Sequence, residues 1–428
     1  MPDAPTLHLD LASQEFAHHA YERYTELRAL APVVRLIQPD RTEVWLVTRY
    51  ADAHRLLADA RLGKDPRSGH AAHINGGFAP PGSPPPETEP MMLFRDPPDH
   101  ERLRRLVQKA FTARRIARLG PRVEEITKDL LDEIEGRDEV DLLAHFALPL
   151  PLTVICELVG VPMEDRAAIR HWTNQMLSTG PVEDASEPRQ LPDQSLFHYL
   201  ARLAERTAPT VRRELPEEAQ PTLLHALVAA SDDRERLSPI ELVEMLVLLL
   251  VAGHETTANL IGNGTLALLR HPEQLHLLRG RPDLIPGAVE EFLRYDGPVE
   301  QATFRYSLVP VPVGEYEIPA QRVVGVVLGS ADHDPEAFRD PETFDVTRPA
   351  GPHLAFGHGI HFCLGAPLAR LEGRIAFTRL LERFPDLALV TPYESLHYRA
   401  AGVLSRGLAA LPVRLRARGL SRAFARHC

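Results

Sequence analysis

The chain has 428 residues, a formal net charge of -11 at pH 7, 44% hydrophobic residues and three cysteines. This length exceeds the usual range of roughly 100–200 residues for one domain, so either two domains or one large integrated domain is expected. The acidic balance argues against a general nucleic-acid binder, because neutralising phosphates requires a basic surface. Three cysteines are too few for a disulfide framework, which favours a reducing compartment, by default the cytoplasm.

The first residues, MPDAPTLHLDLASQEF, lack the basic start and the continuous apolar stretch of a secretory signal. No later segment offers about 18 consecutive apolar residues without charge, the length that a helix needs to cross a bilayer. We therefore expect a protein without a membrane anchor.

Apolar residues recur with helical spacing through most of the chain. Strand-like alternation is confined to two places, a pair at 33–38 and 43–50 across the turn PDRT, and a patch from about Tyr306 to Val327. The predicted fold class is therefore mainly α, helix-rich with a small β-rich part. The helical patterns cover 21–30, 51–59, 123–134, 196–207 and 368–384.

The segment 70–90, HAAHINGGFAPPGSPPPETEP, contains too much proline and glycine for a helix or a strand. Loops of this length in compact domains are usually functional lids or disordered segments. Because helical patterns lie on both sides of it, we expect a mobile lid rather than a domain linker.

The segment 101–118, ERLRRLVQKAFTARRIAR, is basic against the trend of the whole chain. It holds seven basic residues and a single acid, Glu101. Two interpretations are equally favoured, a solvated helix face and a docking site for an acidic partner.

The longest predicted helix runs from Ser238 to Pro272. Ser238 and Glu241 have the spacing of a capping box, Pro239 suits the first helical position, and Pro272 follows the end of the helix. The run from Met245 to Ala252 is apolar on every side, which places this helix in the centre of the protein.

The middle of this helix, AGHETT at 252–257, contains residues that weaken a buried helix. Gly253 costs about 1 kcal/mol relative to alanine, and the carboxylate of Glu255 costs more unless it is partnered. The hydroxyl of Thr256 can bond back to the carbonyl of Ala252. These features indicate a local opening where a small molecule meets a proton donor. The alternative is that Gly253 permits close helix packing and that an arginine pairs with Glu255. A zinc-protease HExxH pair is excluded, because position 258 is alanine.

A single cysteine, Cys363, lies among glycines in FGHGIHFCLG at 356–365, directly before the predicted helix 368–384. Unpaired N–H groups at a helix N-terminus favour negative charge, so we expect a lowered thiol pKa and a thiolate. Gly357, Gly359 and Gly365 add no side chain, so they allow a flat or bulky group to approach the backbone.

Three kinds of chemistry suit this cysteine. A catalytic nucleophile would use His361 as its base, but no oxyanion arrangement is evident. A zinc site could combine Cys363 with His353, His358 and His361, at a spacing that matches no common site. A haem iron needs only one cysteine, whose thiolate favours cleavage of the O–O bond.

The motifs together resemble those of the cytochrome P450 family. FGHGIHFCLG is similar to the family's haem-binding signature at every defined position, and AGHETT resembles its oxygen-activating helix motif. Glu291 and Arg294 resemble its E-x-x-R motif, which the resemblance extends to Arg348. The three motifs occur in the family's order and at its spacing over essentially the whole chain. The resemblance implies the cytochrome P450 fold as a single domain, 1–428.

The resemblance also implies the cofactor and its site. The expected cofactor is haem b (iron protoporphyrin IX) with Cys363 as the axial thiolate ligand of the iron, and dioxygen is the co-substrate. The expected partners of the haem propionates are His100, Arg104, Arg305 and His361. The expected catalytic residues are Glu255 and Thr256, which would deliver protons.

The activity implied is insertion of one oxygen atom into a C–H bond of a bulky natural product, a macrolide or other polyketide in antibiotic biosynthesis. Electrons would come from a ferredoxin and a ferredoxin reductase, because no flavin or Fe–S motif is present in the 428 residues. We expect a cytoplasmic monomer that binds neither nucleic acid nor membrane. The alternatives are a different scaffold (terpenoid, fatty acid or carrier-bound peptide), or a haem protein that binds a ligand without oxygenating it, with a zinc enzyme as a further possibility.

Overall fold

The structure of the protein is a computed structural model that describes residues 2–39, 41–69, 91–177, 192–216, 219–229, 237–399 and 404–415. The expected lid at 70–90 lies outside the described residues.

The helices are α1 Gln14–Leu30, α2 Tyr50–Leu57, α4 Asp99–Ala110, α5 Ala113–Arg118, α6 Gly120–Ile134, α7 Pro149–Val159, α8 Arg166–Leu177, α9 Pro192–Thr207, α10 Leu223–Ala229, α11 Pro239–Arg270, α12 Pro272–Gly280, α13 Ile285–Tyr295, α14 Leu328–Ala331 and α15 Ala366–Arg383. The strands are β1 Thr6–His8, β2 Val33–Ile37, β3 Glu43–Val47, β4 Leu62–Gly63, β5 Glu139–Asp141, β6 Arg305–Ser307, β7 Val311–Val313, β8 Tyr316–Ile318, β9 Val323–Val326, β10 Ala388–Leu389 and β11 Pro412–Arg414.

The largest sheet has six strands in the order β1-β2-β3-β9-β6-β4. β2 and β3 form the antiparallel pair predicted from the alternating pattern, with Val33 opposite Val47. The second predicted strand patch is also confirmed, because it holds β7, β8 and β9 and most of β6. β3 pairs in parallel with β9, which joins the N-terminal hairpin to a segment almost 280 residues later in the chain.

All five helical patterns coincide with helices of the structure, α1, α2, α6, α9 and α15, and none extends more than two residues past the end of its helix. The capping box at the start of α11 is present, with the Ser238 side chain accepting from the Glu241 N–H and the Glu241 side chain accepting from the Ser238 N–H. Pro367 occupies the first turn of α15. Local sequence signals therefore identified these six helices correctly.

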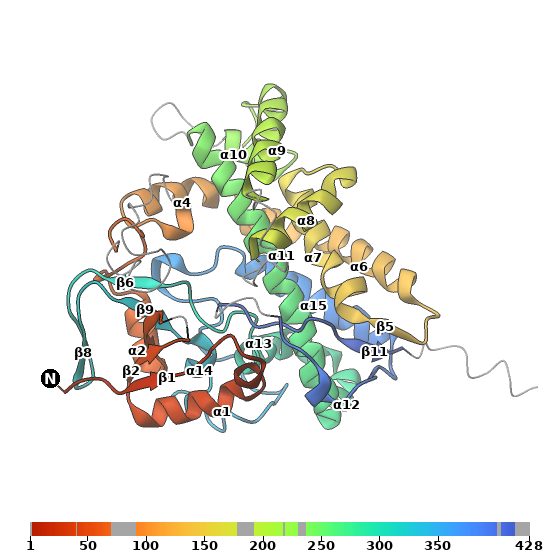
Figure 1. Ribbon diagram of the computed structural model, residues 1–428. Coiled ribbons are helices and arrows are strands. Elements are labelled where there is room, and N and C mark those ends of the chain that lie inside the picture. Colours follow the sequence, from red (N-terminus) through yellow and green to blue (C-terminus); the bar gives the residue numbers. More distant parts are fainter. Residues whose placement is uncertain are drawn as a thin grey trace, which may run out of the picture.

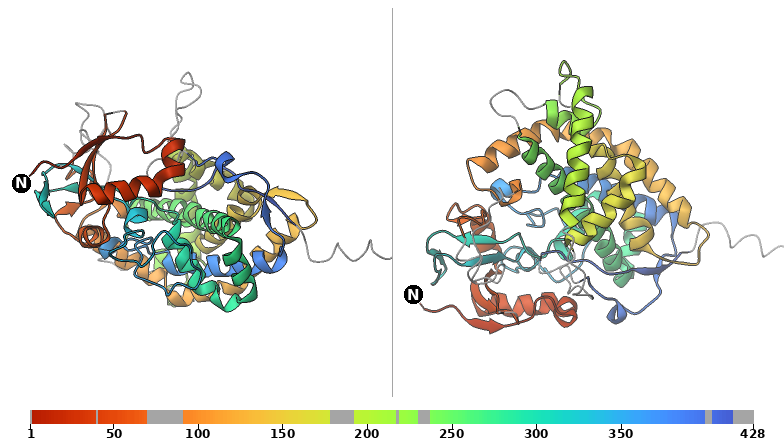
Figure 2. Two further views of the ribbon diagram at one scale, coloured as in Figure 1. Left: turned by 90° about the horizontal axis from the view of Figure 1, so that it is seen from below. Right: turned by 45° about the horizontal axis from the view of Figure 1, so that its top comes forward.

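Helix α11 crosses the centre of the molecule, with the large sheet and α1 on one side and α6 to α9 on the other (Figure 1). The turned views show the same division (Figure 2). By length and composition α11 could cross a membrane, but 67% of its apolar window is buried inside the protein. Its apolar surface therefore packs against other parts of the same chain.

Helix α7 packs closely against α11 at one glycine. A Cβ at Gly253 would lie 2.9 Å from a side-chain carbon of Ile155 on α7, so a larger residue would force the two helices apart. α11 remains helical through this point. The local opening expected around Gly253 is therefore wrong as a description of the backbone, and the alternative of close helix packing is correct for this glycine.

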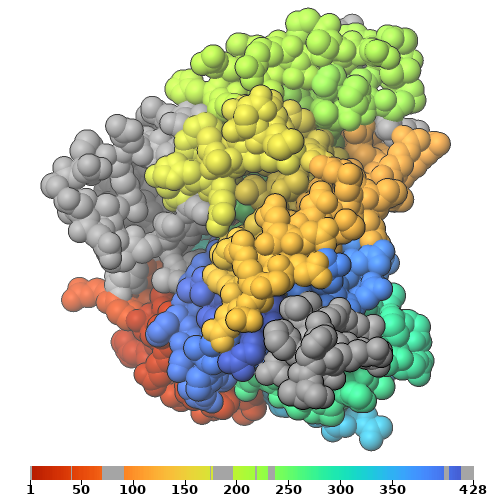
Figure 3. Space-filling model, turned by 90° about the vertical axis from the view of Figure 1, so that its right-hand side faces the viewer, coloured from red at the N-terminus to blue at the C-terminus, as the bar shows by residue number. Residues whose placement is uncertain are grey.

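The second sheet has three strands, in the order β10-β11-β5. They join the region after α15 to the segment after α6, and α6 itself contacts α15. Figure 3 shows this face, with α6 in orange and α15 in blue. The sequence analysis did not identify these strands, because each has only two or three residues and so shows no measurable alternation.

Candidate functional site

A cavity of about 290 Å³ lies between α11, the loop before α15, α4 and the start of β6. Its wall is mostly apolar and includes Leu248, Leu249 and Leu260 from α11 together with Leu368 and Ala369 from α15. Cys363 and Thr256 both line it. The cavity therefore joins the two sequence motifs that lie more than 100 residues apart.

The loop 356–365 folds so that the thiol of Cys363 faces the cavity. The N–H of Cys363 donates to the carbonyl of Phe356 (2.9 Å), which closes the loop. Gly357 and Gly359 have φ of 72° and 76°, a left-handed conformation that favours glycine. A Cβ at Gly359 would also lie 3.0 Å from the carbonyl oxygen of Leu57, so α2 supports the loop from outside.

The pKa of the Cys363 thiol is raised above its ordinary value, which corrects the expectation of a lowered pKa. Desolvation of the sulfur by the surrounding protein is the largest cause, although the residue as a whole is exposed. The N–H groups of Gly365 and Ala366, with the charges of Arg104 and Arg370, lower the pKa, as expected for a helix N-terminus, but they do not outweigh the burial. A cation bound in the cavity would lower this pKa and favour the thiolate.

The four predicted propionate partners meet at one edge of the cavity. His100 and Arg104 come from α4, Arg305 begins β6, and His361 precedes the cysteine. The rings of His100 and His361 lie 4.1 Å apart between centroids, and Arg104 donates to the carbonyl of Phe362 (2.6 Å). Residues separated by up to 261 positions are thus brought together, as the resemblance implied.

Burial lowers the pKa of all four groups. Burial, followed by the charges of Arg104 and Lys64, lowers the pKa of His100 to about 4. Burial lowers the pKa of Arg305 to about 10. Burial, with the charge of Lys64 as the next cause, lowers the pKa of His361 to about 2. Each shift would be relieved by an anion placed among them.

The sequence analysis missed Lys64, which lines the same cavity directly after β4. The available signal was weak, because a lysine between glycine and aspartate in RLGKDP reads as an ordinary exposed turn residue. Only the pairing of β4 with β6 places it beside Arg305.

The residues present fit a haem group. A thiol faces the cavity from one side, and a surplus of cationic and imidazole groups lies at one edge. The Nδ1 atom of buried His100 has no hydrogen-bond partner among the described residues. Among those residues, no carboxylate lies within ion-pair distance of Arg104 or Arg305. This donor set suits one axial ligand bond and two propionates.

Thr256 and Glu255 face different surroundings. The hydroxyl of Thr256 donates to the carbonyl of Ala252 (3.0 Å), as predicted, and the residue lines the cavity. Glu255 is buried and is not part of the cavity wall. Successive side chains on a helix point about 100° apart, so the two residues present one carboxyl and one hydroxyl to different sides of the same turn.

Glu255 has an arginine partner that the sequence analysis left as an alternative. Arg399 Nη1 lies 3.5 Å from Glu255 Oε1, and Arg399 Nη2 donates to Asn259 Oδ1 at 2.6 Å. Burial raises the pKa of Glu255, and the charge of Arg399 opposes this shift. A bridge between Tyr398 and Leu408 holds Arg399 next to α11. Nothing in the local sequence indicated this contact.

The E-x-x-R pair forms a buried structural centre. Arg294 donates to both carboxylate oxygens of Glu291, at 2.7 and 2.9 Å. Arg348 Nε lies 3.1 Å from Glu291 Oε2, which completes the network implied by the resemblance. Arg294 also donates to the carbonyls of Asp332 and Pro341, so it ties α13 to the segment after α14.

The histidines of the zinc alternative point in separate directions. His353 pairs with Glu290 (3.0 Å), and His358 stacks on His54 with centroids 3.8 Å apart. His361 lies against His100. Within the described ranges, no group of three or more His, Cys, Asp or Glu side chains is placed to hold a metal ion.

The basic residues of the segment 101–118 differ in their exposure. Arg102 pairs with Glu241 of α11, and Arg115 is buried with its guanidinium donating to the carbonyl of Gln220 (3.2 Å). The expectation that the whole segment presents a docking surface is therefore wrong for these two residues. The exposed basic residues of the segment are Arg105, Lys109, Arg114 and Arg118.

Comparison with known proteins gives consistent similarities. The profile of the family "Cytochrome P450" matches residues 283–389. The chain is 45% identical to the vitamin D(3) 25-hydroxylase of Pseudonocardia autotrophica over 94% of this chain and 96% of that protein. It is 42% identical to the 6-deoxyerythronolide B hydroxylase of Saccharopolyspora erythraea over 95% of this chain and 98% of that protein. The tirandamycin C-bound structure of the P450 monooxygenase TamI superposes with a TM-score of 0.82 at 41% identity, covering 96% of this chain and all of that one.

Proposed function

The chain belongs to the cytochrome P450 family of haem-thiolate monooxygenases, and we propose that its substrate is a bulky, mostly apolar natural product, a macrolide or other polyketide. One observation carries this proposal. Cys363 and Thr256 line one apolar cavity, the arrangement needed to hold a C–H bond near a reactive centre. The relatives named for 6-deoxyerythronolide B and tirandamycin C support a polyketide, although the vitamin D(3) relative shows that similar chains serve another scaffold.

We propose haem b as the cofactor, held by Cys363 at the iron and by His100, Arg104, Arg305 and His361 at the propionates. When bound, a haem with an axial thiolate supplies the cleavage of dioxygen and the insertion of one oxygen atom. Cys363, which is exposed to the cavity, would hold the iron, and the positive charge of that iron would favour the thiolate form of this residue.

The apolar wall orients the substrate and excludes water from the reacting atoms. Leu248, Leu249 and Ala252 project from α11 into the cavity, where they add apolar contact without hydrogen-bonding groups. The chain's polar contribution on this side comes from Thr256 and its neighbour Thr257. Regiochemistry is therefore set mainly by shape, because few of the described groups in the wall can bind a specific polar atom.

We propose that Thr256 and Glu255 supply protons. The hydroxyl of Thr256 already donates its hydrogen to the carbonyl of Ala252. Its oxygen can therefore accept a hydrogen bond from a proton donor in the cavity and hold that donor in place. Glu255 lies outside the wall against Arg399. A proton taken up by Glu255 must therefore pass around α11, or the carboxyl must turn away from Arg399, before it reaches the cavity.

Electrons are proposed to come from a ferredoxin and its reductase, with the protein as a cytoplasmic monomer. The exposed basic residues of α4 and α5, Arg105, Lys109, Arg114 and Arg118, offer a surface for an acidic partner. Ile360 and Phe362 of the cysteine loop are 45% and 40% exposed, and α4 contacts this loop through Arg104. Exposed apolar residues beside a basic surface are typical of protein interfaces.

The first experiment is the carbon monoxide difference spectrum of the reduced protein, followed by titration with a panel of macrolides and other polyketides. We expect a thiolate-type spectrum, which Cys363→Ser abolishes, and a spin-state change with at least one polyketide. An unchanged spectrum in Cys363→Ser would contradict the ligand assignment. A response to steroids or fatty acids alone, followed by oxygenated product from them, would contradict the substrate class.

A further inference from the structure

Lys64 is a fully buried lysine in the wall of the cavity. It is 2% exposed and is among the largest completely buried side chains of the protein. Its backbone is fixed, because its N–H donates to Asp96 Oδ1 at 2.8 Å and the N–H of Asp65 donates to Asp96 Oδ2 at 3.2 Å. Gly63 permits this arrangement, since a Cβ there would lie 2.9 Å from the Asp96 carboxylate.

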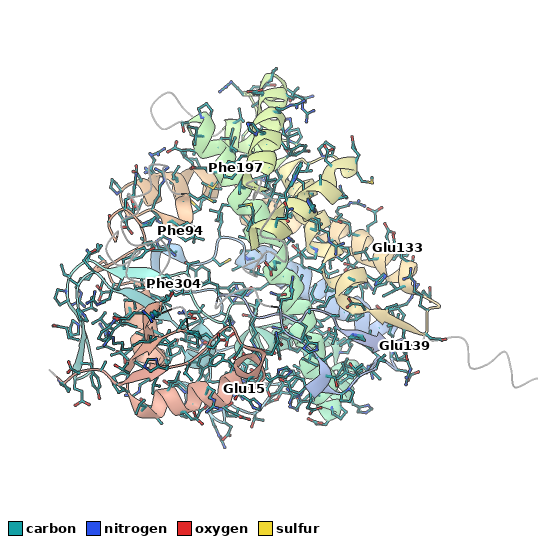
Figure 4. All side chains as sticks on the ribbon, in the orientation of Figure 1. Glu15, Phe94, Glu133, Glu139, Phe197 and Phe304 are labelled. Atoms are coloured by element: carbon teal, nitrogen blue, oxygen red, sulfur yellow. The ribbon has the colours of Figure 1, made fainter. Side chains whose placement is uncertain are left out.

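The ammonium of Lys64 contacts a hydroxyl and an aromatic ring. It donates to the hydroxyl of Thr303 and lies 5.7 Å from the ring centroid of Phe94. Figure 4 shows that Phe94 lies between α4 and β6. Among the described residues no carboxylate lies within ion-pair distance of this nitrogen, and the nearby Asp96 uses both oxygens for backbone N–H groups. Burial, followed by the charge of Arg305, lowers the pKa of Lys64 well below its ordinary value.

Lys64 adjoins the propionate group of residues rather than the apolar part of the wall. Thr303 accepts from Lys64 through its hydroxyl and from Arg305 through its carbonyl (3.0 Å), so both cations meet on one residue. Lys64 is also the largest charge effect on His361 after burial. An uncompensated ammonium in such a place costs several kcal/mol. The ammonium of Lys64 is therefore stabilised only when an anion binds beside it.

We propose that Lys64 is a further haem-binding residue, whose ammonium pairs with a propionate carboxylate when haem occupies the cavity. Haem would bring two carboxylates to an edge where the nitrogens come from Lys64, His100, Arg104, Arg305 and His361. Among the described residues, Asp96 is the acid whose charge acts on Lys64. The inference rests on the haem site of the proposed function but is independent of the substrate.

Two consequences follow from this pairing. Removing the ammonium leaves a propionate less well compensated, so haem dissociates faster. It also removes one positive charge near the iron, which favours the ferric over the ferrous state and lowers the reduction potential. Both effects belong to the protein without substrate, so a purely substrate-binding lysine would produce neither.

The test compares Lys64→Met and Lys64→Gln with the wild type, using haem transfer to apomyoglobin and potentiometric titration without substrate. We expect dissociation about tenfold faster in both variants. We also expect a tenfold less favourable one-electron reduction, which is about 59 mV. Lys64→Arg keeps the positive charge, so its haem dissociation rate and reduction potential should stay close to those of the wild type. Lys128→Met is the matched control, because Lys128 is 70% exposed on α6 and pairs with Asp132 (2.9 Å).

Reconstitution with haem dimethyl ester identifies the anion. Because the ester has no propionate charge, wild type and Lys64→Met should then lose haem at the same rate. A difference that persists with the ester, or equal dissociation rates and potentials with natural haem, would overturn the proposal. Loss of binding confined to acidic ligands such as fatty acids would assign Lys64 to the substrate instead. A wild type without a thiolate-type spectrum would refute the haem site itself, which is a distinguishable failure.

Discussion

Replacement of Thr256 by alanine should separate oxygen consumption from product formation. The residue lines the cavity, and its hydroxyl donates to the Ala252 carbonyl at 3.0 Å. If this hydroxyl positions the proton donor, its loss leaves binding of the substrate intact. The reducing equivalents are then released as hydrogen peroxide rather than used for product.

The effect on stability should be small by comparison. The hydrogen bond of Thr256 is worth roughly 0.5–1.5 kcal/mol net, and the Ala252 carbonyl keeps its main-chain partner because α11 is unbroken. Alanine has a better helix propensity than threonine by up to about 0.7 kcal/mol, which offsets part of the loss. We therefore expect the free energy of unfolding to change by less than about 1 kcal/mol. A positioned proton donor contributes roughly 10²–10⁴-fold to a rate, so product per reducing equivalent should fall at least about tenfold.

The assay measures product, hydrogen peroxide and consumed reducing equivalents in the same reaction, with a surrogate ferredoxin and reductase. Thr265→Ala is the matched control, because its hydroxyl makes the same type of bond on the same helix, to the Ile261 carbonyl at 2.7 Å. Thr265 is buried and does not line the cavity. Thr256→Ser, which keeps the hydroxyl, should retain most of the coupling.

Unchanged coupling in Thr256→Ala would refute this reasoning. Protons would then reach the cavity by a route without the Thr256 hydroxyl, for example through a hydroxyl of the substrate. Equal losses of coupling in Thr256→Ala and Thr265→Ala would also refute it, since the cause would then be a general change of α11.

Three further predictions concern charged residues. Glu255→Gln should slow turnover about tenfold at every pH without changing the substrate dissociation constant more than twofold, measured by product formation and spin-state titration; wild-type turnover would refute a proton role. Burial would raise the pKa of Glu290, but hydrogen bonds from its histidine and arginine partners hold it at about 2, against an ordinary value of 4.5. Because the pKa of Glu290 is depressed in the folded state, Glu290→Gln should lower the free energy of unfolding by about 2–3 kcal/mol above pH 4.5. Urea titrations should show this difference shrinking as the pH falls towards 2. A difference independent of pH would contradict the assignment. Charge reversal at Arg105, Arg114 and Arg118 should slow reduction by ferredoxin about tenfold at low salt and leave substrate affinity unchanged, with the effect lost at high salt; a reduction rate insensitive to both would remove the docking surface.

The sequence predicted the elements that depend on local interactions. Helix periodicity and the Ser238 capping box defined α11 because both signals act within a few residues. Alternation defined the β2–β3 hairpin, whose strands are separated by a short turn. By contrast, β5, β10 and β11 are strands only because distant segments meet, so no local pattern could reveal them.

The sequence also predicted most of the site through motif order. Cys363, His100, Arg104, Arg305 and His361 were identified by resemblance, and the structure brings all five to one cavity. Their spacing alone could not show this, since three separate elements carry them. The resemblance was informative because it summarised a tertiary arrangement that local physics does not specify.

Only the tertiary structure decided the electrostatics of these residues. The helix N-terminus at Cys363 predicted a lowered thiol pKa, but burial outweighs the N–H groups. Glu255 acquires its partner from Arg399, about 140 residues away, and Lys64 becomes buried because β4 pairs with β6. The basic segment loses Arg102 and Arg115 to contacts with other parts of the fold. A sequence shows which charges exist, whereas desolvation and pairing depend on what the fold places around each one.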